Sequence, residues 1–253
     1  MHLPEIDKFA HLKSPLHSWD ARVKIVSIST LILSIVLLED IRVAFVGLVL
    51  AIILVLLSKI PLSFVFVHLR WVLFFVLALF VVISLTVPGN ILIKLSFLSI
   101  SREGVRLSLL ISLRAISAAL LVFPMLGTTR FYLTLKALQK IKIPAQLIQL
   151  LMFTYRYIFF FLDEERRVFI GATSRGFVRK TNLFSLKTIG SLVGMLLVHS
   201  FERTERIRDA MVSRGYNGRV KTLDEFTLSV KDFIKASLII AIALLLNLLR
   251  WIR

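Results

Sequence analysis

The sequence predicts an all-α integral membrane protein with about five transmembrane helices and a further helical region in the cytosol. Of its 253 residues, 57% are hydrophobic, and the mean hydropathy is +0.86. Soluble domains are only about 45 to 50% apolar. Five apolar stretches come close to the roughly 20 residues that cross the hydrocarbon core of a bilayer. Lys and Arg number 32 against 15 Asp and Glu, and the net charge of +17 is typical of proteins that meet anionic membranes or nucleic acids.

Residues 1–22 form the first predicted segment, a cytosolic arm. They contain six charged side chains and no apolar core of a signal peptide. The arm also holds His2, His11 and His17, and imidazole is a ligand that suits cobalt and nickel. Their irregular spacing among charged residues favours a solvated arm over a metal site.

Residues 23–126 are predicted to form a membrane bundle of four spans. The acidic pair Glu39-Asp40 separates the first two spans, and Pro88-Gly89-Asn90 is a strong turn signal after the third. The segment Ile91–Arg106 is mixed in character, and we interpret it as a loop. The predicted spans are Val23–Leu38, Ile41–Leu57, Trp71–Val87 and Leu107–Leu126.

Residues 127–233 differ in kind, because charge clusters alternate with apolar runs. The run Leu147–Leu162 contains Arg156 and the run Leu192–Val198 is short, so both are predicted to lie along the membrane or beneath the bundle rather than to span it. Four crossings return the chain to the cytosol, and the Lys and Arg excess here agrees with the positive-inside rule. Residues 234–253 are the predicted fifth span, although Arg250 and Arg253 then lie outside, against that rule.

An internal repeat lies within the cytosolic region. Leu162–Val168 leads to Ser174-Arg175-Gly176-Phe177, and 39 positions later Phe201–Ile207 leads to Ser213-Arg214-Gly215-Tyr216. Each copy is predicted to be helical, with opposite charges at i and i+4 in Asp163–Arg167 and Glu202–Arg206.

Each Ser-Arg-Gly-aromatic sequence predicts the end of a helix. Glycine after the last turn adopts the left-handed conformation, and the following aromatic side chain folds back on the helix. A helix cap needs Gly176 and Gly215, but it does not need the same Ser and Arg twice. A two-fold symmetric partner with two equivalent grooves does need such duplication.

These residues resemble the two Ala/Ser-Arg-Gly motifs of the transmembrane T component of energy-coupling factor (ECF) transporters, a class of prokaryotic ABC importers. Residues 14–24, Ser-Pro-Leu-His-Ser-Trp-Asp-Ala-Arg-Val-Lys, resemble the family's Ser-Pro-Leu-His-x-x-Asp-Pro-Arg-x-Lys segment, with Ala21 where Pro is usual. The Arg102-Glu103-Gly104 stretch followed by Arg114 is a less specific match. The N-terminal segment most resembles the cobalt-type permease family CbiQ.

The resemblance implies an energy-coupling permease subunit that joins a small substrate-binding membrane protein, the S component, to a dimer of P-loop ABC ATPases. Two cytosolic coupling helices would each dock one Arg motif in an ATPase. The implied coupling residues are Arg175 and Arg214, with Ser174, Gly176, Ser213 and Gly215 holding the helix ends. The implied location is the prokaryotic cell (inner) membrane, with the N-terminus and the coupling region, residues 127–233, in the cytoplasm.

Enzymatic activity has no support in the sequence. A P-loop, an HExxH motif, paired cysteines and a nucleophile elbow are all missing, and the chain has no Cys. We therefore expect no catalytic residue, metal site or cofactor in this chain, with ATP and Mg²⁺ on the partner subunits. A membrane lipid-modifying enzyme that holds an anionic headgroup on the basic region is the nearest enzymatic alternative.

Other functions remain as alternatives. The same architecture serves vitamin importers, as a dedicated or shared T component, beside the cobalt or nickel import that CbiQ resemblance favours. A self-sufficient channel or secondary carrier would need polar residues along a membrane path, and the predicted spans contain no Asp or Glu. Nucleic-acid binding by the basic region lacks a recognition motif and interleaved aromatics.

Overall fold

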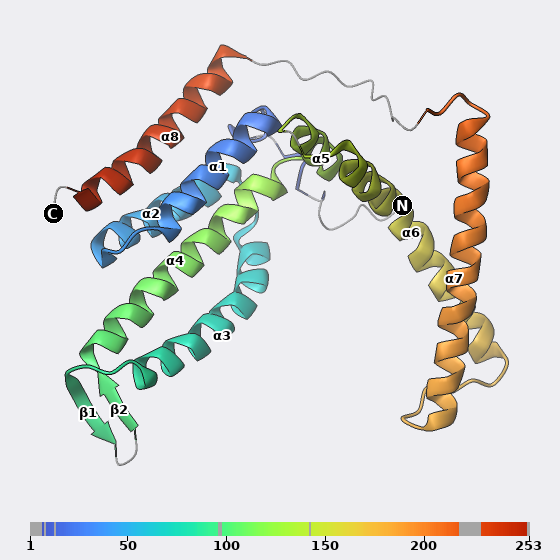
Figure 1. The fold of residues 1–253 in the computed structure, drawn as a ribbon, viewed down its shortest axis with the longest axis horizontal. Coiled ribbons are helices and arrows are strands. Elements are labelled where there is room, and N and C mark those ends of the chain that lie inside the picture. The colour runs from blue at the N-terminus through green and yellow to red at the C-terminus, as the bar shows by residue number, and fades with distance from the viewer. Residues whose placement is uncertain are drawn as a thin grey trace. The chain divides into compact units, whose positions relative to one another are not determined.

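A computed structural model describes residues 7, 9–12, 14–95, 98–141, 143–217 and 229–251 (Figure 1). This part of the chain contains eight helices and one two-stranded hairpin, which confirms the predicted helical class. The elements are α1 (Ala21–Val36), α2 (Ile41–Ser58), α3 (Leu62–Thr86), β1 (Ile91–Leu95), β2 (Leu98–Ser101), α4 (Arg102–Gly127), α5 (Phe131–Lys140), α6 (Ala145–Ser174), α7 (Leu183–Val212) and α8 (Val230–Trp251).

The chain divides into two compact units, which are described separately. The membrane unit comprises Met1–Ile141 and Phe226–Arg253, and the helix-pair unit comprises Lys142–Glu225. Helix α5 therefore groups with the membrane unit, and α6 and α7 form the helix-pair unit.

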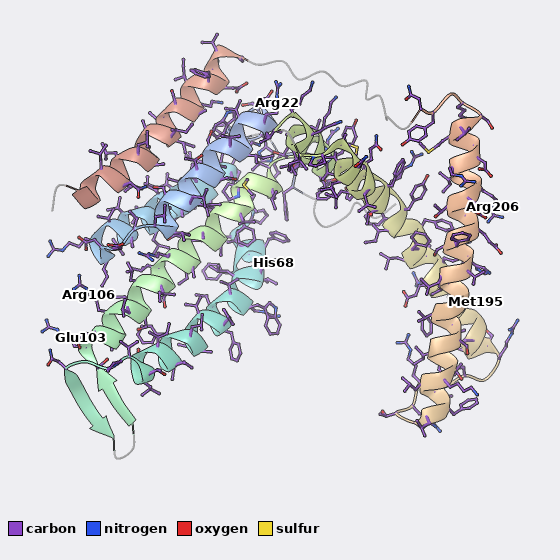
Figure 2. The ribbon with its side chains drawn as sticks, in the orientation of Figure 1. Arg22, His68, Glu103, Arg106, Met195 and Arg206 are labelled. Atoms are coloured by element: carbon purple, nitrogen blue, oxygen red, sulfur yellow. The ribbon has the colours of Figure 1, made fainter. Side chains whose placement is uncertain are left out.

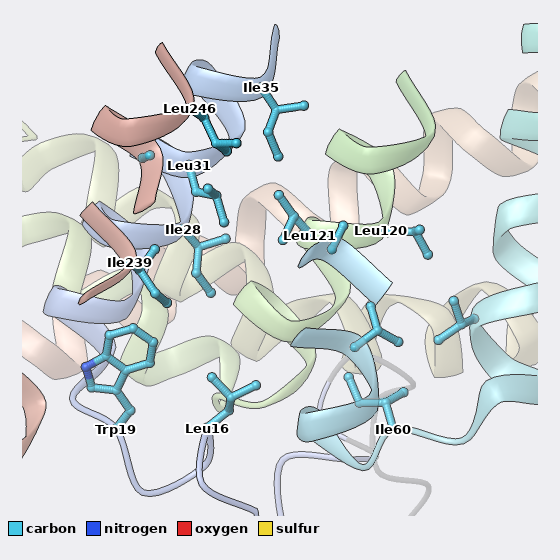
Figure 3. Close-up of a cluster of buried hydrophobic side chains, with 14 of the residues drawn as sticks. Leu16, Trp19, Ile28, Leu31, Ile35, Ile60, Leu120, Leu121, Ile239 and Leu246 are labelled. Atoms are coloured by element: carbon cyan, nitrogen blue, oxygen red, sulfur yellow. The ribbon is translucent and has the colours of Figure 1, made fainter. Parts of the chain in front are cut away.

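Helix α1 lies at the centre of the membrane unit. Asp20 caps its N-terminus by accepting a hydrogen bond from the Arg22 backbone N–H. Ile28, Leu31 and Ile35 are buried at 0 to 2% exposure in the main apolar cluster (Figure 3), where side chains of α2, α4 and α8 join them. The result is a core wrapped around α1, with apolar outer faces on α2 and α3.

Hydrogen bonds between helices supplement this packing. Asn247 of α8 donates to the Ser34 hydroxyl of α1 at 2.7 Å, and Ser34 donates to the Ala243 carbonyl at 2.8 Å. Ser84 of α3 and Ser108 of α4 lie 3.0 Å apart. Such bonds contribute to helix association in a membrane, because lipid is as apolar as the helix surfaces and the hydrophobic effect does not drive the helices together there.

A buried lysine joins the start of α1 to the end of α4. Lys24 is fully buried, and its Nζ donates to the Thr128 Oγ1 at 2.8 Å and the Thr129 Oγ1 at 2.7 Å. Ile60, just after α2, lies against Gly127. The start of α1 and the ends of α2 and α4 therefore lie at one end of the membrane unit.

The prediction that Ile91–Arg106 forms a loop is wrong. Strands β1 and β2 pair antiparallel there, with Leu95 opposite Leu98, and α4 already begins at Arg102. In β2 apolar residues alternate with serine, and β1 is a short apolar run with one lysine, so both patterns are compatible with strands. Ser101 caps α4 by accepting from the Gly104 N–H at 2.9 Å, which fixes the earlier helix start.

The predicted spans and the observed helices differ in other places. Helix α3 begins at Leu62 rather than Trp71, after Pro61. Within the described residues, five helices are long and apolar enough to cross a membrane, namely α2, α3, α4, α6 and α7. Helix α1, with 16 residues, and helix α8, which contains most of the predicted fifth span, are not among these five. Helices α6 and α7 qualify because each contains an 18-residue stretch that is apolar and carries at most two charged residues. Each helix then continues to 30 residues through a charge cluster.

Candidate functional site

The two long helices of the helix-pair unit cross each other at equivalent positions of the sequence repeat. The residues that line a polar hollow at the crossing include Phe160, Phe161, Glu164 and Arg167 of α6. The two copies of the repeat are 39 positions apart. The four residues of α7 at the corresponding positions also line this hollow, namely His199, Ser200, Arg203 and Arg206. The equivalent residues of the two copies therefore also occupy equivalent positions in the structure.

Two contacts at the crossing make this equivalence explicit. The Arg203 guanidinium stacks on Phe160, with Cζ 3.4 Å from the ring centroid. The His199 Nδ1 lies 3.6 Å from a Glu164 carboxylate oxygen. Because Phe160 corresponds to His199 and Glu164 to Arg203, exchanging the two helices turns one contact into the other. A local two-fold axis through the crossing requires this pattern.

The helices run in opposite directions from the crossing. Beyond it, the Tyr216 hydroxyl donates to the Gln149 side-chain oxygen at 3.3 Å, so the end of α7 lies beside the start of α6. Gln149 and Ser174 are separated by about 38 Å of helix at 1.5 Å per residue. The end of α6 and the end of α7 are thus at opposite ends of the pair, consistent with their positions in Figure 2 on either side of Arg206 and Met195.

The end of α6 is a Schellman cap. Gly176 has φ of +85°, its N–H donates to the Thr173 carbonyl at 3.0 Å, and the Phe177 N–H donates to the Ala172 carbonyl at 3.1 Å. The Ser174 hydroxyl donates to the Ile170 carbonyl one turn back at 2.9 Å.

The end of α7 repeats this geometry atom for atom. Gly215 has φ of +81°, its N–H donates to the Val212 carbonyl at 2.9 Å, and the Tyr216 N–H donates to the Met211 carbonyl at 3.0 Å. The Ser213 hydroxyl donates to the Asp209 carbonyl at 2.9 Å. The predicted left-handed glycines are confirmed, and the duplicated serine has an equivalent local role in both copies.

Both motif arginines occupy the last position before the left-handed glycine. Arg175 and Arg214 are exposed, and neither guanidinium has an ion pair or hydrogen bond among the residues that the structure describes. The structure therefore presents two chemically identical cations, each on a rigid helix end and each available to a partner. The coupling role assigned to Arg175 and Arg214 stays a prediction.

The charge pairs predicted within each copy are different in the structure. Arg167 lies 3.9 Å from Glu164 rather than pairing with Asp163, and no ion pair joins Glu202 to Arg206 in the described helix. Glu164 lies at the crossing, within 4 Å of both Arg167 and His199. Sequence reasoning also missed Phe160 and His199, although extending the repeat by a few positions toward the N-terminus pairs them.

In the N-terminal arm, His17 makes two hydrogen bonds. His17 Nε2 donates to the Phe9 carbonyl at 2.8 Å, and Nδ1 accepts from the Ser14 hydroxyl at 2.7 Å. Burial lowers the pKa of His17 below its usual 6.5, and nearby Lys24 lowers it further, against the carbonyl bond. Among the described residues no three His, Asp or Glu side chains gather, and His2 lies outside them.

These features define a helical integral membrane protein with several spans and a duplicated helix pair. The chain belongs to the CbiQ family, because the family model described as a cobalt transport protein matches residues 12–223. Components of this family are non-catalytic, as the sequence predicts for this chain.

Relatives extend the match along most of the chain. The energy-coupling factor transporter transmembrane protein EcfT of Macrococcus caseolyticus is 31% identical over 224 residues, 84% of each chain. EcfT of Bacillus subtilis is 28% identical over 225 residues, again 84% of each. An uncharacterized protein of Methanocaldococcus jannaschii is 27% identical over 251 residues, 95% of this chain and 85% of the relative.

Proposed function

We propose that this chain is the transmembrane energy-coupling subunit of an ECF-type importer. In this role it transmits the conformational change of a P-loop ABC ATPase dimer to a small substrate-binding membrane subunit. ATP and Mg²⁺ bind the ATPases, and this chain binds no cofactor.

One observation carries the proposal, namely the pseudo-two-fold pair of helix ends. Arg175 and Arg214 lie on identical helix caps. Because Tyr216 at the end of α7 contacts Gln149 near the start of α6, the length of α6 from there to Ser174 sets the separation of the caps at about 38 Å. Two equivalent ligands related by a two-fold axis match a partner with two equivalent binding grooves. An arginine at each end suits a groove that offers a carboxylate, because the guanidinium binds carboxylates bidentately. The EcfT names of the relatives support the same assembly.

The helix pair is proposed to lie along the cytoplasmic face rather than across the membrane. If α6 and α7 spanned the bilayer, the crossing would put Glu164, Arg167 and Arg203 at mid-helix in hydrocarbon. Charged groups in that position are expensive unless they line a functional path. An interfacial position keeps the crossing and both arginines in water.

The charge distribution of the membrane unit supports a cytoplasmic N-terminus. The end where α1 starts and α2 and α4 finish is the more basic of the two, as the positive-inside rule requires. It carries Arg22, Lys24, Lys59, Arg130, Lys136, Lys140, Lys231 and Lys235, whereas the opposite end carries Arg42, Lys94, Arg102, Arg106 and Arg250.

We propose cobalt or nickel as the cargo of the importer, which would connect this chain to cobalamin biosynthesis. The family description and residues 14–24 favour this cargo. The EcfT name specifies no cargo, so a vitamin importer with a dedicated or shared T component is the second candidate. In either case the S component selects the substrate.

Affinity purification of the tagged chain from native membranes in mild detergent tests the proposal. We expect mass spectrometry to find P-loop ATPases and one or more small hydrophobic subunits in the eluate. The identity of the small subunit then distinguishes cobalt or nickel from vitamins. Repeated purification of the chain alone, under conditions that preserve ABC complexes, would overturn the coupling role and favour the channel or carrier alternative.

A further inference from the structure

An apolar groove lies in the membrane unit between α2 and α8, with α1 as its floor. It encloses about 290 Å³ and is lined almost entirely by carbon. Leu54 and Leu57 of α2 face Leu238 and Ile242 of α8 across it, and Leu31 of α1 lies beneath. Leu57 and Leu238 are 47% and 62% exposed, so the groove is open at these two positions.

Two residues with polar groups, Trp19 and Lys235, line the cytoplasmic end of this groove. Trp19 lines it and is 4% exposed, yet its indole Nε1 has no hydrogen-bond acceptor among the residues that the structure describes. Figure 3 shows this nitrogen turned away from Leu16 and Ile28. A buried N–H without an acceptor is costly, so the site favours a ligand that brings an oxygen atom.

Two lysines on one face of α8 add positive charge at the same end. Lys235 lines the groove, and its Nζ donates to the Pro15 carbonyl at 3.2 Å. Lys231 stands one turn earlier, and residues four apart share a helix face. Leu238 and Ile242 continue this face into the apolar part. Along α8 the groove therefore changes from cationic to aliphatic in the direction that enters the bilayer.

The nearby carboxylates are already engaged. Asp20 binds Arg22 in an ion pair of 3.0 Å. Asp232 is 5% exposed and accepts a hydrogen bond from the Ser229 N–H at 3.4 Å. Neither carboxylate is among the residues that line the groove, whereas Lys235 is.

We propose that this groove binds an anionic phospholipid of the cytoplasmic leaflet. One acyl chain fills the aliphatic part, the phosphate faces Lys235, and an oxygen of the headgroup or glycerol backbone accepts the Trp19 N–H. The bound lipid bridges α2 and α8, whose direct contact is sparse compared with the contact of each helix with its main neighbour. The order of charge, N–H donor and aliphatic wall matches a phospholipid from headgroup to tail.

Native mass spectrometry of the purified full-length chain tests this site, with phosphatidylglycerol and phosphatidylcholine added in equal amounts. We expect one phosphatidylglycerol to be retained in preference to phosphatidylcholine. Lys235→Gln should weaken its retention about fivefold, the factor expected for one lysine near an anionic surface. Trp19→Phe, which removes the N–H donor and one of the two fused rings, should weaken retention of both lipids. Leu238→Trp fills the groove and should abolish the specific binding.

Lys140→Gln is the matched control, because Lys140 is an exposed lysine at the end of α5, away from the groove lining. It should retain phosphatidylglycerol as the wild-type chain does. Equal retention of the two lipids, or full retention by Leu238→Trp, would overturn the proposal. Capture of a protein subunit instead of lipid by a photo-crosslinker at position 238 in native membranes would also overturn it. These readouts need no ATPase, so they are independent of the coupling role.

Discussion

The membrane unit and the helix-pair unit differ most in how much of each helix is buried. Helix α1 buries eight of its 16 residues, whereas the described residues of α6 bury only Ile148 and those of α7 only Ser185. Exposed apolar side chains run along the helix pair, among them Leu150, Leu197 and Phe201. Helices α6 and α7 are therefore longer than α1 but bury a much smaller fraction of their residues.

This difference indicates where each unit obtains its stability. The membrane unit has a core of its own, so it is able to hold its helices together in lipid. The helix pair has a crossing held by Phe160 and Arg203, and its remaining exposed apolar surface is typical of one that meets a membrane or a partner protein. Large exposed apolar surfaces mark such interaction sites. Four predictions test this division.

The largest effect is expected from Arg175→Ala combined with Arg214→Ala. Each single change should weaken ATPase binding, and the double variant should lose substrate uptake completely while it still inserts into the membrane. Uptake assays and quantification of the chain in membranes measure the two results. Arg166→Ala is the control, since Arg166 is an exposed arginine of the same helix that lies outside the Ser-Arg-Gly motif. Normal uptake by the double variant would contradict the coupling assignment.

The second prediction compares burial directly. Ile28→Ala in the membrane unit should lower the free energy of unfolding by about 2 to 5 kcal/mol, because it leaves a cavity at a fully buried position. Leu197→Ala on α7, at 66% exposure, should change it by no more than about 0.5 kcal/mol. Unfolding in detergent micelles measures both. Similar losses for the two variants would show that the helix pair also has a packed core.

The third prediction separates cap geometry from docking. Gly215→Ala forces a side chain into the left-handed conformation and should cost about 1 to 2 kcal/mol at the end of α7. Gly190→Ala, within α7 and with open space around it, should instead stabilise the helix by about 0.5 to 1 kcal/mol. Amide hydrogen exchange at Tyr216 measures the local effect. If Gly215→Ala abolished uptake while the Arg variants were silent, the motif would be a cap only.

The smallest effect is a pH dependence in the membrane unit. Burial lowers the pKa of His17, so the folded chain binds the proton less tightly than the unfolded chain. Stability from this group is therefore complete above about pH 6.5 and is lost as the pH falls through the lowered pKa of the folded state. Thermal unfolding between pH 7.5 and 5.5 should show this loss. His17→Gln should reduce the slope, whereas His11→Gln, at an exposed site, should leave it unchanged.

The sequence predicted the helices of the membrane unit where the apolar runs are long and uninterrupted, as in α2. It misplaced the start of α3 because His68 and Arg70 interrupt the run after Leu62. It missed the hairpin because Lys94 and the serines hide the alternation of apolar residues. Hydropathy detects the part of a helix that fits a bilayer, and it does not detect where the hydrogen-bonded helix begins.

The two helix ends were predictable because a Schellman cap is a local structure. Gly176 and Gly215, followed by aromatic residues, specify it within a few positions. The crossing was not predictable in the same way, because Glu164 meets His199 and Phe160 meets Arg203 across the connection between two helices. The repeat implied that the copies are alike, but only the fold brings them together around one axis.

The position of the crossing has a mechanical consequence. Glu164 and Arg203 are equivalent in the repeat, so Arg175 and Arg214 lie the same distance beyond the crossing, about 17 Å along each helix. The pair is an equal-armed lever with its fulcrum at Phe160 and Arg203. Equal forces that draw the two ends together produce balanced torques about this fulcrum. They change the angle between α6 and α7 without displacing the fulcrum sideways.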